Sequence, residues 1–337
     1  MTKADVDTSA ELIAAVRDAS VREINIGPGD YELGGIMLQF EHNDVEVHGH
    51  GEVNIRKGGL LTKANNLLFT NLICHAGYHD PDQDDAMQIV YRVYKEGIRS
   101  EYIEVRNCEF YTGADETFSV WGGKHVKVFN SIVAKGAVNA GHSKGNRGKG
   151  MLIGVSEDVH IEGCYMHTNI DRNPMINGCY GLVIKNNATW NYGHAGLGIY
   201  SEYMPLKDAL ITGNHYRRGP LTVDHVQYGM LIDHDTKYAS RSHNIVFENN
   251  ATTLKNRNRT DPSKTNVVQH TWKDGTPPIS FEDIVANAGA NKGNVAKPNP
   301  PAPTPPSPPA PPAPKPEPIE VQVSDKKVRV TVDIELI

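Results

Sequence analysis

The sequence lacks the marks of several protein classes. Its four cysteines form no CxxC pair and are too few for a disulfide framework in 337 residues, which excludes zinc fingers, zinc ribbons and thioredoxin motifs. No run of 18 apolar residues occurs, so we expect no membrane-spanning helix. The start, MTKADVDTSAEL, has no basic segment followed by an apolar one, so we see no secretory signal in this chain. A net charge of −6 and a pI near 6.2 give no basic field for nucleic acid.

Proline is scarce except near the C-terminus. Thirteen of the 21 prolines lie between Pro298 and Pro318, where the missing N–H groups exclude helix and sheet interiors. We expect residues 298–318 to be a polyproline II linker. Residues 319–337 alternate apolar and polar side chains around SDKK, which predicts a C-terminal β-hairpin. Because an isolated hairpin is marginal in water, we expect it to pair with an assembly partner or the body; a frayed tail is the alternative.

Residues 1–297 contain a repeat. The pattern is a polar pair, apolar–x–apolar, one further residue, and then Asn or Gly, as in NDVEVHGH, KHVKVFNS and HNIVFENN. Successive copies are separated by 22, 36, 23, 33, 23, 27 and 36 residues. The first apolar position falls at Val45, Leu67, Ile103, Val126, Val159, Leu182, Ala209 and Ile245.

A unit of about 22 residues is shorter than most helical repeats, and leucine-rich spacing is absent. The repeat therefore predicts an all-β parallel solenoid, with Asn or Gly providing left-handed corners. One Asn above another could stack its amide along the solenoid. The next residue should point inward, so we interpret Cys108 and Cys164 as buried structural thiols. One helix is expected at 9–19, as a cap on the first coil.

Two patches of opposite charge interrupt the repeat. HDPDQDD and the pair Asp115–Glu116 gather carboxylates that would suit calcium, or would form a solvated acidic loop. From Thr117 to Ser156 there is no acidic residue, while AGHSKGNRGKG is basic and lacks the phosphate-loop pattern. A basic stretch beside an acidic one predicts a local anion site. Arg172 follows Asp171, with which it could also form a structural pair.

The segment from about Ala114 to Gly193 resembles the pectate lyases of polysaccharide lyase family one. It carries, in order, an acidic residue before SVWG, the strand KGMLIG, and RNP followed by LVIKNN. The resemblance implies a right-handed parallel β-helix that cleaves a polyuronate by calcium-dependent β-elimination. It fades before about Gly34 and after about Gly213.

The resemblance also implies residue roles. Asp85, Asp115 and Glu116 would bind Ca²⁺, with Asp84 as a further candidate. Lys149 would bind the uronate carboxylate. Arg147 and Asn177 would be further substrate-binding residues. Arg172 would be the base, so Arg172 and Lys149 are the expected catalytic pair.

The chain departs from the family pattern at two positions. Ser119 stands where many members have a third acidic ligand, and Asn177 stands where many have a second arginine. Glu116 or Asp84 would supply the missing carboxylate, or the substrate's own carboxylate would complete the calcium site.

Two other functions fit the same sequence. A glycoside hydrolase would use paired carboxylates, Asp115–Glu116 or Asp233–Asp235, but would leave Lys149 and Arg172 without a role. A non-catalytic polysaccharide-binding protein, such as a phage tail or other surface protein, would suit the linker and the hairpin. We expect an extracellular or virion-associated protein whose partner is an acidic polysaccharide, with no nucleic acid and no membrane.

Overall fold

The computed structural model describes residues 2–77, 85–90, 97, 99–143, 145, 148–222, 228–233, 236–254, 257–259, 268, 270–292, 320–323 and 326–329. The chain forms two compact units, Met1–Gly293 and Asn294–Ile337. In the second unit β26 (Glu320–Val323) pairs in antiparallel fashion with β27 (Lys326–Arg329). The predicted linker 298–318 lies outside the described residues. The boundaries 1–297, 298–318 and 319–337 stay predictions.

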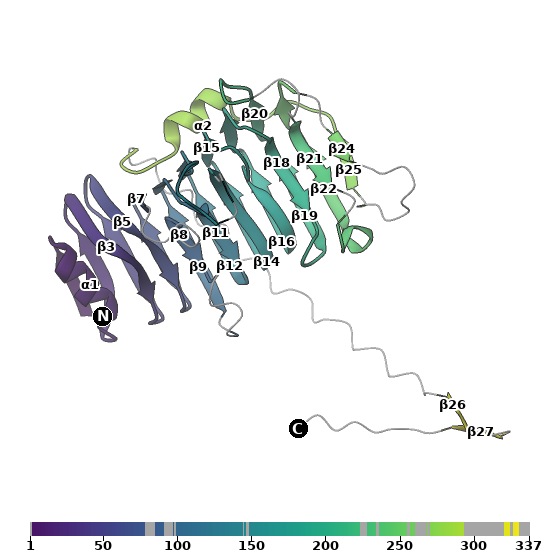
Figure 1. The fold of residues 1–337 in the computed structure, drawn as a ribbon, viewed down its shortest axis with the longest axis horizontal. Helices are drawn as coiled ribbons and strands as arrows, with labels where there is room; N and C mark the ends of the chain where they lie inside the picture. Colours follow the sequence, from purple (N-terminus) through teal and green to yellow (C-terminus); the bar gives the residue numbers. More distant parts are fainter. Residues whose placement is uncertain are drawn as a thin grey trace. The chain divides into compact units, whose positions relative to one another are not determined.

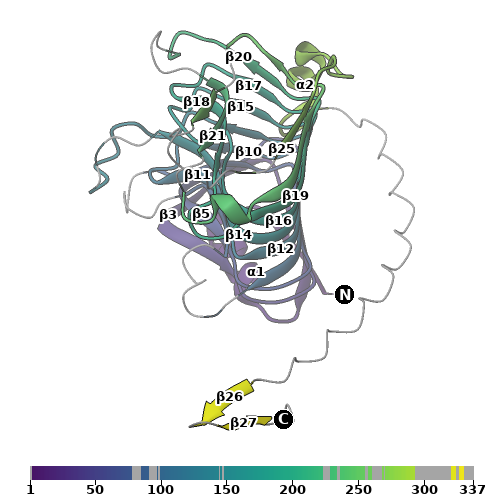
Figure 2. The ribbon, with the colours of Figure 1, turned by 90° about the vertical axis from the view of Figure 1, so that its right-hand side faces the viewer.

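The first unit is a solenoid of three parallel sheets (Figure 1). Viewed from the end, the sheets form three sides around the core (Figure 2). Four long strands bend from one sheet into the next, so the first and second halves of each strand pair within different sheets. They are β3 (Gly29–Phe40), β5 (Val53–Thr62), β14 (Lys149–Glu162) and β16 (Met175–Lys185).

Each sheet takes one strand from each coil. Sheet I contains the second halves of β14 and β16 and the strands β1 (Thr2–Val6), β2 (Val21–Ile26), β4 (Val45–Gly49), β6 (Leu67–Thr70), β9 (Ser100–Arg106), β12 (Gly123–Phe129), β19 (Leu206–Thr212), β22 (His243–Glu248) and β25 (His270–Lys273). Sheet II contains the first halves of β3 and β5 and the strands β7 (Ile73–His75), β10 (Glu109–Tyr111), β13 (Ile132–Ala134), β15 (Tyr165–His167), β17 (Ala188–Trp190), β20 (His215–Arg217) and β23 (Ala251–Thr252). Sheet III contains the second halves of β3 and β5, the first halves of β14 and β16, and the strands β8 (Met87–Ile89), β11 (Glu116–Trp121), β18 (Ala195–Tyr200), β21 (Tyr228–Asp233) and β24 (Arg257–Arg259).

The predicted repeat is confirmed by the register of sheet I. Each first apolar residue of the pattern pairs with the corresponding residue of the next coil, without a shift. The aligned residues are Val45, Leu67, Ile103, Val126, Val159, Leu182, Ala209 and Ile245. The longer intervals are therefore insertions outside sheet I.

Left-handed corners flank the strands of sheet I on both sides. The expected Asn or Gly corner after the strand has positive φ, for example at Asn130 (φ 46°) and Gly163 (φ 69°). The residue just before the first apolar position of the repeat is also left-handed, for example His125 (φ 54°) before Val126 and Asp158 (φ 49°) before Val159. The predicted repeat includes this position only as part of its polar pair, although Asp, Asn or Gly occupies it in most coils.

Inward-pointing residues follow the Asn or Gly corner and connect the coils. Cys164 N donates to Asn187 Oδ1 (2.8 Å), and Asn187 N donates to Asn214 Oδ1 (2.9 Å). Asn214 N donates in turn to Asn250 Oδ1 (3.0 Å). The amide ladder thus lies one residue beyond the corner at which we expected asparagines to stack. All four cysteines are free and buried, and burial raises the pKa of Cys108 and Cys164 to about 12, as expected for structural thiols.

The corner asparagines explain why glycine alternates with them in the C-terminal coils. Asn130 Oδ1 occupies the space that a Cβ at Gly163 would need, and Asn186 Oδ1 does the same at Gly213. A side chain at either glycine would collide with the asparagine of the preceding coil.

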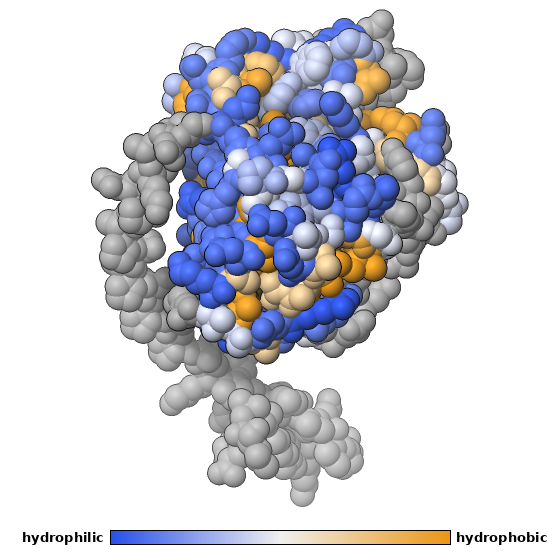
Figure 3. Space-filling view, turned by 90° about the vertical axis from the view of Figure 1, so that its left-hand side faces the viewer, coloured by the Kyte–Doolittle hydropathy of each residue, from blue (hydrophilic) through white to orange (hydrophobic). Residues whose placement is uncertain are grey.

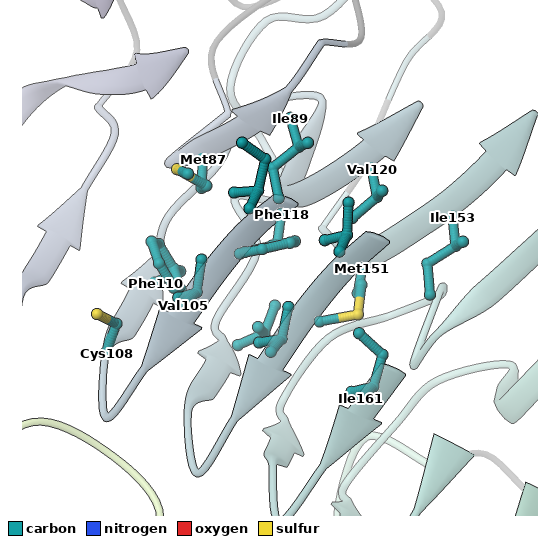
Figure 4. Close-up of a cluster of buried hydrophobic side chains, with 14 of the residues drawn as sticks. Met87, Ile89, Val105, Cys108, Phe110, Phe118, Val120, Met151, Ile153 and Ile161 are labelled. Carbon is teal, nitrogen blue, oxygen red and sulfur yellow. The ribbon is translucent and has the colours of Figure 1, made fainter. Parts of the chain in front are cut away.

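One apolar core fills the space between the sheets. Cys108, Phe118, Met151 and their neighbours belong to the same buried cluster. Figure 4 shows side chains of sheets I and III pointing toward one another across this core. The labelled residues are Met87, Ile89, Val105, Cys108, Phe110, Phe118, Val120, Met151, Ile153 and Ile161.

The predicted helix forms as α1 (Ser9–Arg17) and lies at the N-terminal end of the solenoid (Figure 1). Thr8 and Glu11 form a capping box, and Leu12 and Val16 join the core. The surface at this end is mainly hydrophilic, with smaller hydrophobic patches (Figure 3). A terminal cap has this character because it must cover an open core while facing water.

A second helix was not expected from the sequence. After β25, α2 (Phe281–Asn287) contacts sheet II, where the Phe281 ring packs edge-to-face on Tyr165 and His215. A 3₁₀ turn, Ala239–Arg241, precedes β22. No helix among the described residues has the length and hydropathy to cross a bilayer.

The amide ladder predicts the effect of Asn214→Ala on stability. The substitution removes the acceptor for Asn187 and the donor to Ile184 O (2.9 Å) inside the solenoid. We expect the free energy of unfolding in denaturant to fall by about 2–3 kcal/mol, because buried polar groups lose their partners. Asn287→Ala, at an exposed side chain on α2, is the control and should cost about 0.5 kcal/mol. Equal losses in the two variants would show that the ladder does not stabilise the fold.

Candidate active site

Charged residues from successive coils meet where the strands of sheet III begin. Asp85 lies two residues before the first residue of β8, Glu116 is the first residue of β11, and Lys149 is the first residue of β14. Glu116 pairs with Lys149, which forms a β-bridge with Asp171 on the following coil. Parallel pairing places such residues one strand spacing, about 4.8 Å, apart. The solenoid thereby brings together residues up to 86 positions apart in the chain, from Asp85 to Asp171.

Glu116 lies at the centre of this charged cluster. Its carboxylate is fully buried and forms an ion pair with Arg172 Nη1, while Lys149 Nζ lies 3.9 Å from Glu116 Oε1. Arg172 has left-handed backbone geometry (φ 62°), and Asp171 Oδ1 accepts a hydrogen bond from its N–H (2.8 Å). Arg172 and Lys149, the two expected catalytic residues, therefore both lie beside the Glu116 carboxylate. From the sequence we expected this carboxylate to bind calcium.

Asp85 is fully buried beside the same strand. Its Oδ1 accepts a hydrogen bond from Glu116 N (3.1 Å), and its Oδ2 accepts one from Ser119 Oγ (2.7 Å). Ser119 stands where many family members have a third acidic ligand. Here its hydroxyl group orients the Asp85 carboxylate and supplies no carboxylate of its own.

Asp115 contacts a residue for which the sequence analysis proposed no role. Its Oδ1 lies 3.1 Å from His142 Nε2, and both side chains are buried. His142 belongs to the insertion between β13 and β14, the glycine-rich basic segment of the sequence. Only the fold shows that this insertion returns to the start of β11, because no local pattern links residues 115 and 142.

Of the remaining predicted residues, Asn177 lies apart from this cluster. Asn177 pairs with Gly154, five residues along β14 from Lys149, and its Oδ1 accepts a hydrogen bond from Glu202 N (2.9 Å). Arg147 and Asp84 lie outside the described residues. The cluster therefore consists of Asp85, Asp115, Glu116, Lys149 and Arg172, together with His142 and Asp171.

The donor atoms can be tested against calcium. Asp85, Asp115 and Glu116 offer carboxylate oxygens, the donors that calcium prefers, but calcium takes six to eight of them. Over the part of the chain that the structure describes, no three His, Cys, Asp or Glu side chains are arranged to hold a metal. With Glu116 bound to Arg172, Asp85 and Asp115 are the remaining carboxylates of the cluster that a calcium ion could use, and a bound acidic ligand and water would have to supply its other donors.

The family model for the right-handed β-helix region matches residues 98–269, about half of the chain. The chain belongs to this family of right-handed β-helix proteins. No curated protein matches the sequence significantly.

Solved structures share the fold at low identity. One pectate lyase, studied for its substrate specificity and anti β-elimination mechanism, is 9% identical, with a TM-score of 0.56 over 86% of this chain and 92% of that one. Pectate lyase Bsp165PelA from Bacillus sp. N165, in complex with trigalacturonate, is 10% identical, with a TM-score of 0.54 over 86% and 93% of the two chains. PfbA, a surface adhesin of Streptococcus pneumoniae, is 12% identical, with a TM-score of 0.51 over 80% and 75%. The fold is thus common to lyases and to an adhesin.

The buried charges predict a large effect of Glu116→Gln on stability. Removing the carboxylate leaves Lys149 and Arg172 without their common buried counter-charge. We expect the free energy of unfolding to fall by about 3 kcal/mol, since breaking a buried pair strands a charge. Glu282→Gln breaks an exposed Arg–Glu pair with Arg217 and should cost less than about 1 kcal/mol. The expectation fails if both variants unfold at the same denaturant concentration.

Proposed function

We propose that the protein is a polysaccharide lyase that cleaves a polyuronate by calcium-assisted β-elimination, outside the cell or on a virion. The observation that supports this most is the charged cluster itself. Asp85, Asp115, Glu116, Lys149 and Arg172 were selected from a resemblance between sequences, and they come from separate coils to one place on sheet III. A purely structural solenoid has no need for this concentration of buried charge, which is expensive to desolvate.

In this proposal Lys149 binds the uronate carboxylate and Arg172 accepts the C5 proton. The electron pair of the C5–H bond forms the C4–C5 double bond, and the C4–O bond breaks. The oxygen leaves as the new chain end, which takes up a proton from water. The positive charge of Lys149 stabilises the enediolate that develops as the proton departs.

The ion pair between Arg172 and Glu116 adds a condition to this mechanism. Arginine has an ordinary pKa above 12, and a neighbouring carboxylate favours its charged form. Arg172 can act as a base only if polymer binding separates it from Glu116. A uronate carboxylate carries the same charge as Glu116, so it can compete for the same two cations.

Calcium, when bound to Asp85 and Asp115, would help to neutralise the substrate carboxylate and so make C5 more acidic. The two aspartates are already oriented by neighbouring groups, Asp85 by Ser119 and Asp115 by His142.

Non-catalytic binding of an acidic polysaccharide is the second candidate. It is favoured by the ion pair between Arg172 and Glu116, because an arginine that stays protonated can attract an acidic polymer but cannot accept its C5 proton. A hydrolase using Asp115 and Glu116 receives less support, since the two carboxylates contact different partners, His142 and Arg172. For the pair Asp233–Asp235, Asp235 lies outside the described residues.

One assay separates these functions. Polygalacturonate and alginate are incubated with the protein, with and without EDTA, while ultraviolet absorbance and reducing ends are recorded. The lyase produces an absorbing unsaturated end, and EDTA abolishes the increase. Reducing ends without absorbance indicate hydrolysis, whereas polymer binding without either product indicates an adhesin; both results contradict the proposal.

The catalytic roles predict different behaviour for two variants. Arg172→Lys keeps the positive charge but displaces the proton acceptor, so turnover should fall by about 10²–10⁴-fold while polymer binding persists. Lys149→Ala should weaken both binding and turnover, because Lys149 contacts the carboxylate before and during the reaction. Initial rates, binding isotherms and melting temperatures are measured for both variants. Full activity of Arg172→Lys would remove Arg172 from the mechanism.

A further inference from the structure

An aromatic pair lies at the opposite end of the strand that begins with Glu116. Trp121, the last residue of β11, pairs with Gly154, and its ring carbons lie 2.5–2.6 Å from the Cβ position that Gly154 lacks. Glycine is thus required there, because the indole ring covers the backbone of the next coil. The Tyr203 ring packs edge-to-face against Trp121, with ring centroids 5.1 Å apart.

Tyr203 is unusually exposed for a side chain on a well-anchored loop. It is 60% exposed, the highest value among the large hydrophobic side chains of the described residues. The flanking residues are held by hydrogen bonds: Ser201 N to Thr236 Oγ1 (3.1 Å), Ser201 Oγ to Ser242 Oγ (2.8 Å) and Glu202 N to Asn177 Oδ1 (2.9 Å). The Tyr203 ring is therefore fixed in a solvent-exposed position, and packing in the hydrophobic core does not account for its placement.

We infer that Trp121 and Tyr203 form a subsite that binds one sugar ring of the polymer by packing against its C–H face. This inference rests on the proposed function and adds a second contact to it. A pyranose ring has C–H groups on its face and hydroxyl groups around its rim, so it suits an aromatic surface with polar neighbours. Asn177 supplies such a neighbour and is a positioning residue here, because its amide holds the loop that carries Tyr203.

The distance between the two sites fits one extended polymer. Five residues of β11 separate Glu116 from Trp121, and at about 3.3 Å per residue this is roughly 16 Å. A chain of several sugar units is therefore long enough to span the distance between the charged cluster and the aromatic pair. Binding at the aromatic pair depends on apolar contact, so added salt should weaken it much less than binding at the charged cluster.

Tyr203→Ala tests the inference in the intact chain. We expect the affinity for polygalacturonate or alginate oligomers to fall by about tenfold, which is the size of an aromatic contact, with the same ratio at low and high salt. Tyr203→Phe should keep the affinity, because the ring remains.

Tyr102→Ala is the matched control. Tyr102 is 55% exposed and also stacks on another ring, that of His125, but it lies at a corner of sheet I. Loss of the Tyr102 ring should leave the affinity for the polymer unchanged. The melting temperatures of all variants are measured to check that they fold.

The possible results separate this inference from the proposed function. If the original protein cleaves the polymer and Tyr203→Ala binds as tightly as Tyr102→Ala, the subsite is refuted and the lyase stands. If the original protein binds without cleaving and only Tyr203→Ala weakens binding, the subsite stands and the lyase falls. If the original protein binds neither polymer, both are overturned.

Discussion

The solenoid depends on left-handed backbone on both sides of the repeat segment in the sheet I strands from β6 to β22. A positive φ before and after this segment turns the chain sharply, and the segments of successive coils align without slippage. This geometry costs free energy for any residue with a side chain. Asparagine, aspartate and glycine at most of these corners keep the cost small, and hydrogen bonds between coils offset part of it.

The register fixed by these corners also creates the charged cluster. Glu116 and Lys149 start neighbouring strands of sheet III, Asp85 lies just before the preceding strand, and Asp171 forms a β-bridge with Lys149, so parallel pairing makes them neighbours. Buried charges in such numbers are stable only when each has a partner. Glu116 lies beside the cations Arg172 and Lys149, and Asp115 contacts His142, so these buried carboxylates have polar neighbours within the protein.

The repeat and the fold could be predicted from the sequence because they rest on local, repeated patterns. Alternating apolar residues and a corner asparagine or glycine recur from coil to coil, so the strands of successive coils can be aligned from these patterns alone. The contacts of Glu116 could not be predicted in this way. Whether that carboxylate turns toward a metal, Arg172 or Lys149 depends on charges that lie on other coils. The same holds for His142 and Tyr203, whose insertions follow no repeat and whose positions depend on how each loop returns.

Because the charges stand at equivalent positions of successive coils, the spacing of the site does not depend on the lengths of its loops. Strand pairing sets the distance between Glu116 and Lys149, although 32 residues lie between them and include the insertion that carries His142. Insertions can therefore lengthen, shorten or change in composition without moving the charges. Evolution can thus vary what the site accepts through its loops while the scaffold keeps the reacting groups in place, and grafted loops offer the same freedom to protein engineering.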